Sequence, residues 1–280
     1  MPSAPFLFSI DLEDIRQLIP DGNRLSDRVE VTTERYLRFL SDHGSRCTFF
    51  TTGDVARRYP MLVKQIDQEG HEVACHSDDH TPLDRHDPES LREDLLRCFE
   101  AYAQAGVGEV KGFRAPIGSM TGDTRWAYDV LRELGFRYSA SVLAAASPLY
   151  GWPEFGPDHP RREGGLWEFP VSLASLLGMR VPFMGGVYFR VLPFPLVRWL
   201  FRARLARELP VVAYFHPYDV DVEQERFMYP EIGGNRFYNW LMYRNRDQVL
   251  PRLDRLMRLG ARIVPFADHV EELECRAAGV

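Results

Sequence analysis

The chain has 280 residues, of which 45% are hydrophobic and 26% are charged, and its formal net charge is −6. This length and composition fit one large globular domain and exclude a disordered or low-complexity protein. The negative net charge and the dispersed arginines leave no basic stripe for following a phosphate backbone, so no nucleic-acid partner is expected.

Apolar strands and amphipathic helices alternate along the first half of the chain. Alternation of this kind favours parallel β/α units with right-handed crossovers. Glycines or prolines stand at most of the expected element ends. The expected strands are 6–10, 47–52, 72–75, 110–114 and 138–143, and the expected helices are 27–43, 54–69, 88–105 and 123–134.

The second half is less regular. Residues 147–165 are rich in proline, glycine and charge and are expected to form a loop, and residues 223–246 are expected to be an aromatic excursion over the site. No composition shift indicates a linker, so residues 1–280 are expected to form a single α/β domain. The remaining expected strands are 166–171, 211–215 and 262–265, and the remaining helices are 192–207, 247–259 and 267–276.

Features of cellular location are sparse. The N-terminus lacks a basic start followed by a long apolar stretch, so no signal peptide is predicted. Residues 173–201 are apolar, but Arg180, Arg190 and three prolines break the run before it could span a membrane. A buried strand, loop and helix are expected there, with contact to a membrane or a lipid-linked substrate as the alternative. The four cysteines show no Cys-x-x-Cys spacing, so they are expected to be reduced thiols, which fits a cytoplasmic protein. They are Cys47, Cys75, Cys98 and Cys275.

The first strand ends in three acids, Asp11, Glu13 and Asp14. Acids do not gather beside an apolar strand for stability, because like charges repel and desolvation is costly. The strand at 72–75 leads directly into His76 and His80, two imidazoles that a tight turn can direct at one divalent metal. A His-x-x-x-His pair also arises by chance, so the interpretation requires a carboxylate ligand from elsewhere.

Two later strands also end in polar side chains. Arg114 ends the strand at 110–114, and His216 follows the strand at 211–215, with Asp219 three residues further on. In a closed parallel barrel all strand C-termini open onto one face, so we expect these groups to converge with the acids and the histidine pair.

The motifs together resemble the polysaccharide deacetylase family, carbohydrate esterase family 4, with its NodB-homology domain. The resemblance implies a distorted (β/α)7 TIM-like barrel and a metal-dependent hydrolase that removes N-acetyl groups. The stretches that resemble family motifs, in the family's order, are 9–14, 48–50, 70–80, 112–116 and 214–217.

The first motif departs from the common family form, in which the first of two adjacent aspartates is the catalytic base and the second binds metal. Here Leu12 separates Asp11 from Glu13 and Asp14. The resemblance implies Asp11 as base and His76 and His80 as metal ligands, and it leaves the carboxylate ligand open between Asp14 and Glu13. Alternation along a strand would place Glu13 on the face of Asp11.

The resemblance also implies roles for the later motifs. Arg114 is expected to orient Asp11 and keep it negatively charged, and His216 is expected to be the general acid. Asp219 is either the carboxylate that holds His216 protonated or a helix cap. Two imidazoles and a carboxylate suit Zn²⁺, and also Co²⁺, Ni²⁺ or Fe²⁺.

The expected substrate is a saccharide that carries N-acetyl groups, either an amino-sugar polysaccharide or its glycan precursor. Residues 185–193 and 216–219 further resemble the subgroup linked to exopolysaccharide production. One alternative is an allantoinase-like cyclic amide hydrolase, although the aromatic stretch 173–240 favours a large substrate. The other is a glycan-binding barrel without turnover. No oligomeric state is predicted.

Overall fold

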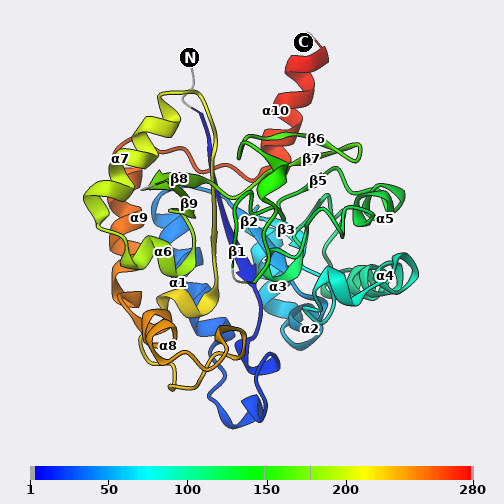
Figure 1. Ribbon diagram of the computed structural model, residues 1–280. Helices are drawn as coiled ribbons and strands as arrows, with labels where there is room; N and C mark the ends of the chain where they lie inside the picture. Colours follow the sequence, from blue (N-terminus) through cyan, green and yellow to red (C-terminus); the bar gives the residue numbers. More distant parts are fainter. Residues whose placement is uncertain (1–3, 148, 177, 279–280) are drawn as a thin grey trace.

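The computed structural model describes residues 4–147, 149–176 and 178–278, with helices packed around a curled sheet (Figure 1). The sheet has the strand order β10-β1-β2-β3-β4-β5-β7-β6. Neighbouring strands in this order run parallel, except that β6 pairs antiparallel with β7. The strands are β1 (Phe6–Leu12), β2 (Thr48–Thr51), β3 (Glu72–Cys75), β4 (Gly112–Phe113), β5 (Tyr138–Ser139), β6 (Arg161–Glu163), β7 (Leu166–Glu168) and β10 (Val211–Phe215).

Helices follow most of the parallel strands and cover the outer face of the sheet (Figure 1). The α-helices are α1 (Val29–Asp42), α2 (Gly53–Arg58), α3 (Pro60–Gln68), α4 (Pro88–Ala105), α5 (Ala127–Glu133), α6 (Gly186–Val191), α7 (Phe194–Leu205), α8 (Arg236–Tyr243), α9 (Val249–Met257) and α10 (Phe266–Ala278). The 3₁₀ helices are η1 (Ile15–Gln17), η2 (Gly22–Arg24), η3 (Leu83–Arg85), η4 (Pro116–Gly118), η5 (Pro153–Phe155), η6 (Pro217–Val220), η7 (Pro230–Ile232) and η8 (Arg246–Gln248).

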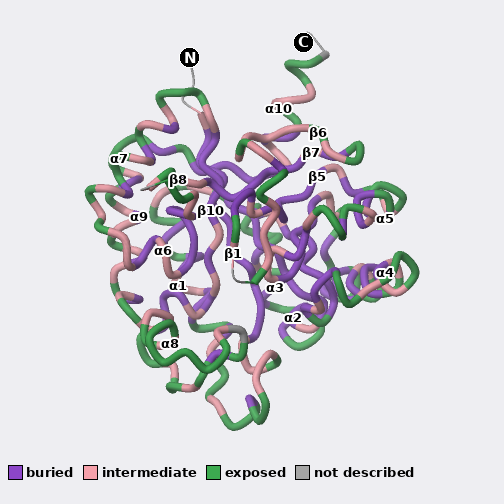
Figure 2. Tube along the Cα trace, in the orientation of Figure 1, coloured by how far each residue is buried: buried purple, intermediate pink, exposed green. Residues whose placement is uncertain are grey.

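Strand β1 divides its side chains between two hydrophobic cores, because successive residues of a strand point to opposite faces. Phe6, Phe8, Ile10 and Leu12 belong to the larger core, which lies between the sheet and the helices, whereas Leu7 belongs to the smaller core inside the curl. All seven residues of β1 are buried, and other buried segments lie close to it (Figure 2). Every second residue after Leu7 therefore points into the barrel. The smaller core also contains Phe50, Ala74, Tyr138, Ala140, Phe169, Val212, Val264, Phe266 and Val270.

The two sides of the curled sheet are joined by hydrogen bonds outside the strand ladders. The Ser172 N–H donates to the Val212 carbonyl oxygen at 3.2 Å, and the Val212 N–H donates to Ser172 Oγ at 2.8 Å. Further along β10, the Tyr214 N–H donates to the Met184 carbonyl oxygen at 3.2 Å. The expected distorted (β/α)7 barrel is thus confirmed as an α/β fold whose mostly parallel sheet forms a half-barrel.

Several expected elements have different bounds in the structure. The helix expected at 54–69 is divided into α2 and α3, because Pro60 has no N–H to continue the hydrogen bonds of α2 and instead begins α3. The prediction of a strand at 262–265 is wrong, since Ile263 makes only an isolated bridge to Phe6.

The second half contains elements that the sequence did not indicate. The predicted loop at 147–165 contributes β6, and the excursion at 223–246 contains α8. Residues 173–201 form the hairpin of β8 (Leu173–Leu176) and β9 (Met179–Pro182), followed by α6 and most of α7. Met179 and Trp199 are exposed there, so the prediction of a buried segment is wrong at these positions. Within the described residues no helix combines the length and the apolar character that crossing a membrane requires.

Candidate active site

The C-terminal end of β1 places two carboxylates inside the barrel. Asp11 and Glu13 lie four and six residues after Leu7, on the same face of the strand, and each is only 5% exposed. Asp14 leaves this face and caps η1 by accepting a hydrogen bond from the Arg16 N–H. Its Oδ2 atom lies 2.7 Å from Arg16 Nη2 and 2.7 Å from Arg58 Nη1. The structure therefore brings Glu13, and not Asp14, to the other predicted site residues.

The two histidines lie on a strained turn after β3. Ser77 and His80 have positive φ angles of 61° and 63°. A residue other than glycine adopts this backbone conformation only when its surroundings hold it there. The His80 N–H donates to Ser77 Oγ at 3.0 Å, and the Asp78 N–H donates to Asp94 Oδ2 on α4 at 2.9 Å. Helix α4 thus fixes the backbone between the two imidazoles.

Glu13 and the two imidazoles form a compact cluster. Glu13 Oε2 lies 2.7 Å from His80 Nε2 and 3.9 Å from His76 Nε2. One ligand atom from each of the three residues lies within 4.8 Å of the others. His76 Nδ1 lies 2.8 Å from the Arg114 carbonyl oxygen, and because a carbonyl only accepts, we assign the proton to Nδ1. The His76 Nε2 lone pair therefore faces the cluster.

The charges in this cluster favour a cation. Burial alone would raise the pKa of Glu13, but the neighbouring imidazoles, above all that of His80, lower it to about 2. Burial lowers the pKa of His76 to about 4, against the opposing effect of the nearby carboxylates. At neutral pH the cluster thus offers an ionised carboxylate and an unprotonated imidazole.

Asp11 is held by Arg114 from the end of β4. Arg114 Nη1 donates to Asp11 Oδ1 at 2.5 Å and to Ser9 Oγ at 2.8 Å, and its Nε donates to the Ala140 carbonyl oxygen at 2.9 Å. The guanidinium stacks on the Phe50 ring, with Cζ 3.9 Å from the ring centroid. Because these contacts fix the guanidinium in one plane, they also fix the orientation of the Asp11 carboxylate.

His216 faces both carboxylates from the end of β10. Its Nε2 lies 3.9 Å from Asp11 Oδ2 and 4.0 Å from Glu13 Oε1. On the other side of the ring, Nδ1 lies 3.2 Å from Asp219 Oδ2, which also accepts the His216 N–H at 2.9 Å. Burial alone would lower the pKa of His216, but the Asp219 hydrogen bond and the charges of Glu13, Asp219 and Asp11 raise it to about 9. Asp219 thus contacts the His216 ring and also caps η6.

The segment expected to cover the site lies beside His216. The Tyr218 ring stacks on the His216 ring with centroids 4.6 Å apart, and the Tyr229 ring lies 5.7 Å from the Tyr218 ring. Arg246 Nη2 donates to the Tyr229 hydroxyl at 2.8 Å. Through the Tyr218 ring, the aromatic excursion therefore contacts the imidazole that the sequence predicted as the acid.

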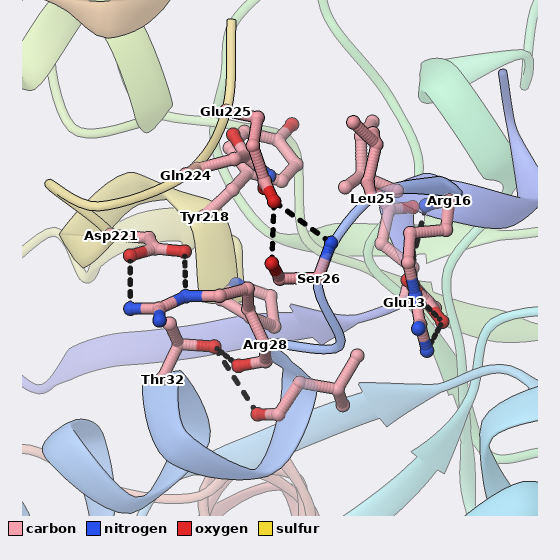
Figure 3. A pocket seen from close by; sticks show the side chains of 14 residues that line it. Glu13, Arg16, Leu25, Ser26, Arg28, Thr32, Tyr218, Asp221, Gln224 and Glu225 are labelled. Carbon is pink, nitrogen blue, oxygen red and sulfur yellow. Dashed lines mark hydrogen bonds and ion pairs between the residues drawn. The ribbon is translucent and has the colours of Figure 1, made fainter. Parts of the chain in front are cut away.

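A narrow pocket opens beside Glu13, between residues 13–32 and residues 217–225 (Figure 3). Arg28 Nη2 lies 2.8 Å from Asp221 Oδ1 and joins the two sides. Ser26 Oγ donates to Glu225 Oε1 at 2.5 Å and joins them again nearer the surface. The loop that precedes α1 and the segment after η6 therefore form one wall of the site.

Arg190 is a site residue to which the sequence analysis gave no role. It lies on α6 with a fully buried side chain, and its Nη2 is 2.9 Å from Asp219 Oδ1. The signal in the sequence was an arginine inside an otherwise apolar run, since a charge is rarely placed there without a partner. Which acid it would meet depends on β10 lying beside residues 184–185, and only the fold shows this.

Comparison with known families divides the chain into two consecutive parts. Residues 21–139 match the polysaccharide deacetylase family, and residues 140–265 match a domain family of unknown function, DUF3473. The first match begins after β1 and ends at Ser139, the last residue of β5, so β1, β10 and the residues that follow β10 lie outside it.

Curated relatives match parts of the chain. A chitooligosaccharide deacetylase of Bradyrhizobium sp. is 33% identical over 127 residues, which cover 45% of this chain and 55% of the relative. A peptidoglycan-N-acetylglucosamine deacetylase of Bacillus cereus is 28% identical over 96 residues, which cover 34% of this chain and 35% of the relative. The chain thus spans about half the length of these relatives or less.

Solved structures share the fold along nearly the whole chain. A Mycobacterium smegmatis protein classed with the polysaccharide deacetylases has a TM-score of 0.61 at 20% identity, covering 99% of this chain and 96% of its own. The Puue allantoinase has a TM-score of 0.61 at 14% identity, with coverages of 95% and 89%. A Bacillus anthracis pseudoenzyme of carbohydrate esterase family 4 has a TM-score of 0.52 at 12% identity, with coverages of 96% and 66%. At these identities the likeness shows the fold alone.

Proposed function

Because the chain contains a polysaccharide deacetylase domain over residues 21–139, we propose that it is a metal-dependent carbohydrate N-deacetylase. The proposed substrate is an amino-sugar polysaccharide or its glycan precursor, from which the protein removes N-acetyl groups. The observation that supports this most is the arrangement at one end of the barrel, where the Glu13 cluster faces both Asp11 and His216.

The donor atoms of the cluster fit a divalent cation. Glu13 Oε2 is buried and faces His80 Nε2 at 2.7 Å, and the low pKa of Glu13 keeps this carboxylate ionised. With His76 and His80 it offers one carboxylate oxygen and two imidazole nitrogens, a set suited to Zn²⁺ and also to Co²⁺, Ni²⁺ or Fe²⁺. A cation held there would supply Lewis-acid chemistry, polarising an acyl oxygen and lowering the pKa of water.

The protein's own residues supply the proton transfers. Asp11, oriented by Arg114, accepts a proton from the attacking water as its oxygen bonds to the acetyl carbon. His216 donates its proton to the amide nitrogen as the carbon–nitrogen bond breaks, and its raised pKa of about 9 keeps it protonated at neutral pH. One water is consumed, and the products are acetate and the free amine.

The resemblance of residues 185–193 to the exopolysaccharide-associated subgroup supports a role in making such a polymer. The cytoplasmic location and the lipid-linked substrate stay predictions from the sequence.

Release of acetate from N-acetylglucosamine oligomers by zinc-loaded protein tests the proposal. We expect turnover that is lost on chelation, is restored by the metal, and is absent in His76→Ala. Asp79→Asn, which changes an exposed acid on the same turn, is the matched control and should retain activity. Hydrolysis of allantoin without acetate release would favour the cyclic amide hydrolase. Glycan binding that survives His76→Ala without any hydrolysis would favour a barrel that only binds.

A further inference from the structure

Arg190 is a charged side chain with no exposure to solvent, placed among apolar residues of α6. A guanidinium at such a position costs several kcal/mol in desolvation unless its donors are satisfied. Its Nη2 forms an ion pair with Asp219 Oδ1 at 2.9 Å, although the two atoms are not aligned as a hydrogen bond. Its Nη1 donates to the carbonyl oxygens of Met242 at 3.0 Å and Arg244 at 2.9 Å. Arg190 therefore joins the Asp219 carboxylate to the end of the 223–246 segment.

The other oxygen of the same carboxylate determines the position of the His216 ring. Asp219 Oδ2 accepts the His216 N–H and faces Nδ1, so the opposite ring nitrogen, Nε2, points at Asp11 and Glu13. If the carboxylate turned about its bond to Cβ, the Nδ1 contact would be lost and the imidazole could rotate. Arg190 restrains this turn together with the His216 N–H, because its Nη2 lies against Oδ1 and its Nη1 is held by two backbone carbonyls.

We propose that Arg190 is a positioning residue for proton delivery: through Asp219 it holds His216 Nε2 toward the reacting amide. This inference rests on the proposed function. Arg190 does not itself touch the substrate. Its effect should therefore appear in the step that needs the His216 proton and not in substrate binding.

Arg246 offers a matched control for the structural part of this role. It is also buried, and it binds the same segment by donating to the Met242 carbonyl oxygen at 3.0 Å and to the Tyr229 hydroxyl at 2.8 Å. Its other hydrogen bonds reach Asp221 and Gln224 and not Asp219, so Arg246→Met should loosen the segment without directly releasing the carboxylate.

The test compares two substrates in zinc-loaded wild type, Arg190→Met, Arg190→Lys and Arg246→Met. An N-acetylglucosamine oligomer requires a proton on its departing amine, whereas 4-nitrophenyl acetate releases a weakly basic phenolate that needs none. We expect Arg190→Met to lower kcat on the oligomer by about 100-fold, the lower end of a general acid's contribution, with KM and zinc content close to wild type. The change on the ester should stay within about 3-fold, and Arg190→Lys should recover part of the loss.

Equal losses on both substrates, or the same selective loss in Arg246→Met, would overturn the proposal. If Arg190→Met does not fold, Asp219→Asn replaces it. That variant should show the same selective loss, and adding Arg190→Lys to it should cause little more. Independent, multiplying losses would show that Arg190 does not act through Asp219.

Failure of the proposed function would look different. Wild-type protein would then release no acetate from any glycan. The positioning of His216 could still be measured from the NMR signals of its ring nitrogens. We expect a hydrogen-bonded Nδ1–H in the wild type that is lost in Arg190→Met but kept in Arg246→Met. An unchanged Nδ1–H signal in Arg190→Met would refute the role of Arg190.

Discussion

Replacing Glu13 or Asp14 by its amide separates the two carboxylates that the sequence left open as metal ligands. Glu13→Gln and Asp14→Asn remove the same charge from adjacent residues, and both side chains are buried. Glu13 points at the histidines, whereas Asp14 pairs with Arg16 and Arg58. The two variants should therefore differ in metal affinity, although they are alike in chemistry.

The magnitude follows from the pKa of Glu13, which lies at about 2 instead of 4.5. This difference corresponds to about 3 kcal/mol in favour of the ionised form, although burial acts against it. A bound divalent cation would place positive charge beside the same carboxylate. Glu13→Gln should therefore weaken Zn²⁺ binding by about 100-fold or more. Asp14→Asn should leave the affinity within about 3-fold but should lower the free energy of unfolding by about 2 kcal/mol, because it breaks a buried pairing.

Calorimetric titration of metal-stripped protein with Zn²⁺ at pH 7 measures the affinities, and urea unfolding measures the stabilities. The reasoning would be refuted if Asp14→Asn lost the metal while Glu13→Gln still bound it tightly. It would also fail if Glu13→Gln bound Zn²⁺ as well as the wild type does.

Three further changes test other parts of the structure. Asp11→Asn should lower acetate release by more than about 100-fold yet retain zinc, because Asp11 pairs with Arg114 and lies outside the ligand cluster; metal analysis and turnover check this. Burial raises the pKa of Asp94 to about 6 from 3.8, so the folded state binds more protons than the unfolded state between these pH values. The protein should therefore lose up to about 3 kcal/mol of stability as the pH rises from about 4 to above 6. In urea unfolding, Asp94→Asn should abolish that loss, and Asp79→Asn should not. Gly185→Ala should destabilise the protein by about 1–3 kcal/mol in the same assay, since its Cβ would lie 2.2 Å from the Tyr214 ring, and an unchanged midpoint would contradict this close packing.

The sequence predicted those site residues that stand directly at or after the end of a strand. In β1 the alternation of Leu7, Ser9, Asp11 and Glu13 determines which acids face inward, and the structure follows that alternation. The convergence of Arg114 and His216 with these acids required only parallel strands in a curled sheet. The structure confirms that these groups meet, and their roles in catalysis stay proposals.

Other features depended on information that no local pattern carries. The choice between Glu13 and Asp14 required the positions of Arg16 and Arg58, which satisfy Asp14 away from the histidines. The contact of Arg190 with Asp219 required knowing that residues before α6 lie against β10. Short strands such as β4 and β5 carry too few residues for a periodic signal, and their pairing depends on their neighbours.

Anomalous diffraction at the zinc edge from crystals of zinc-loaded protein tests the central claim most directly. The account predicts one strong peak bonded to Glu13 Oε2 and to Nε2 of His76, with His80 as the third ligand. A peak bonded to Asp14, or histidines turned away from an ion bound elsewhere, would contradict it.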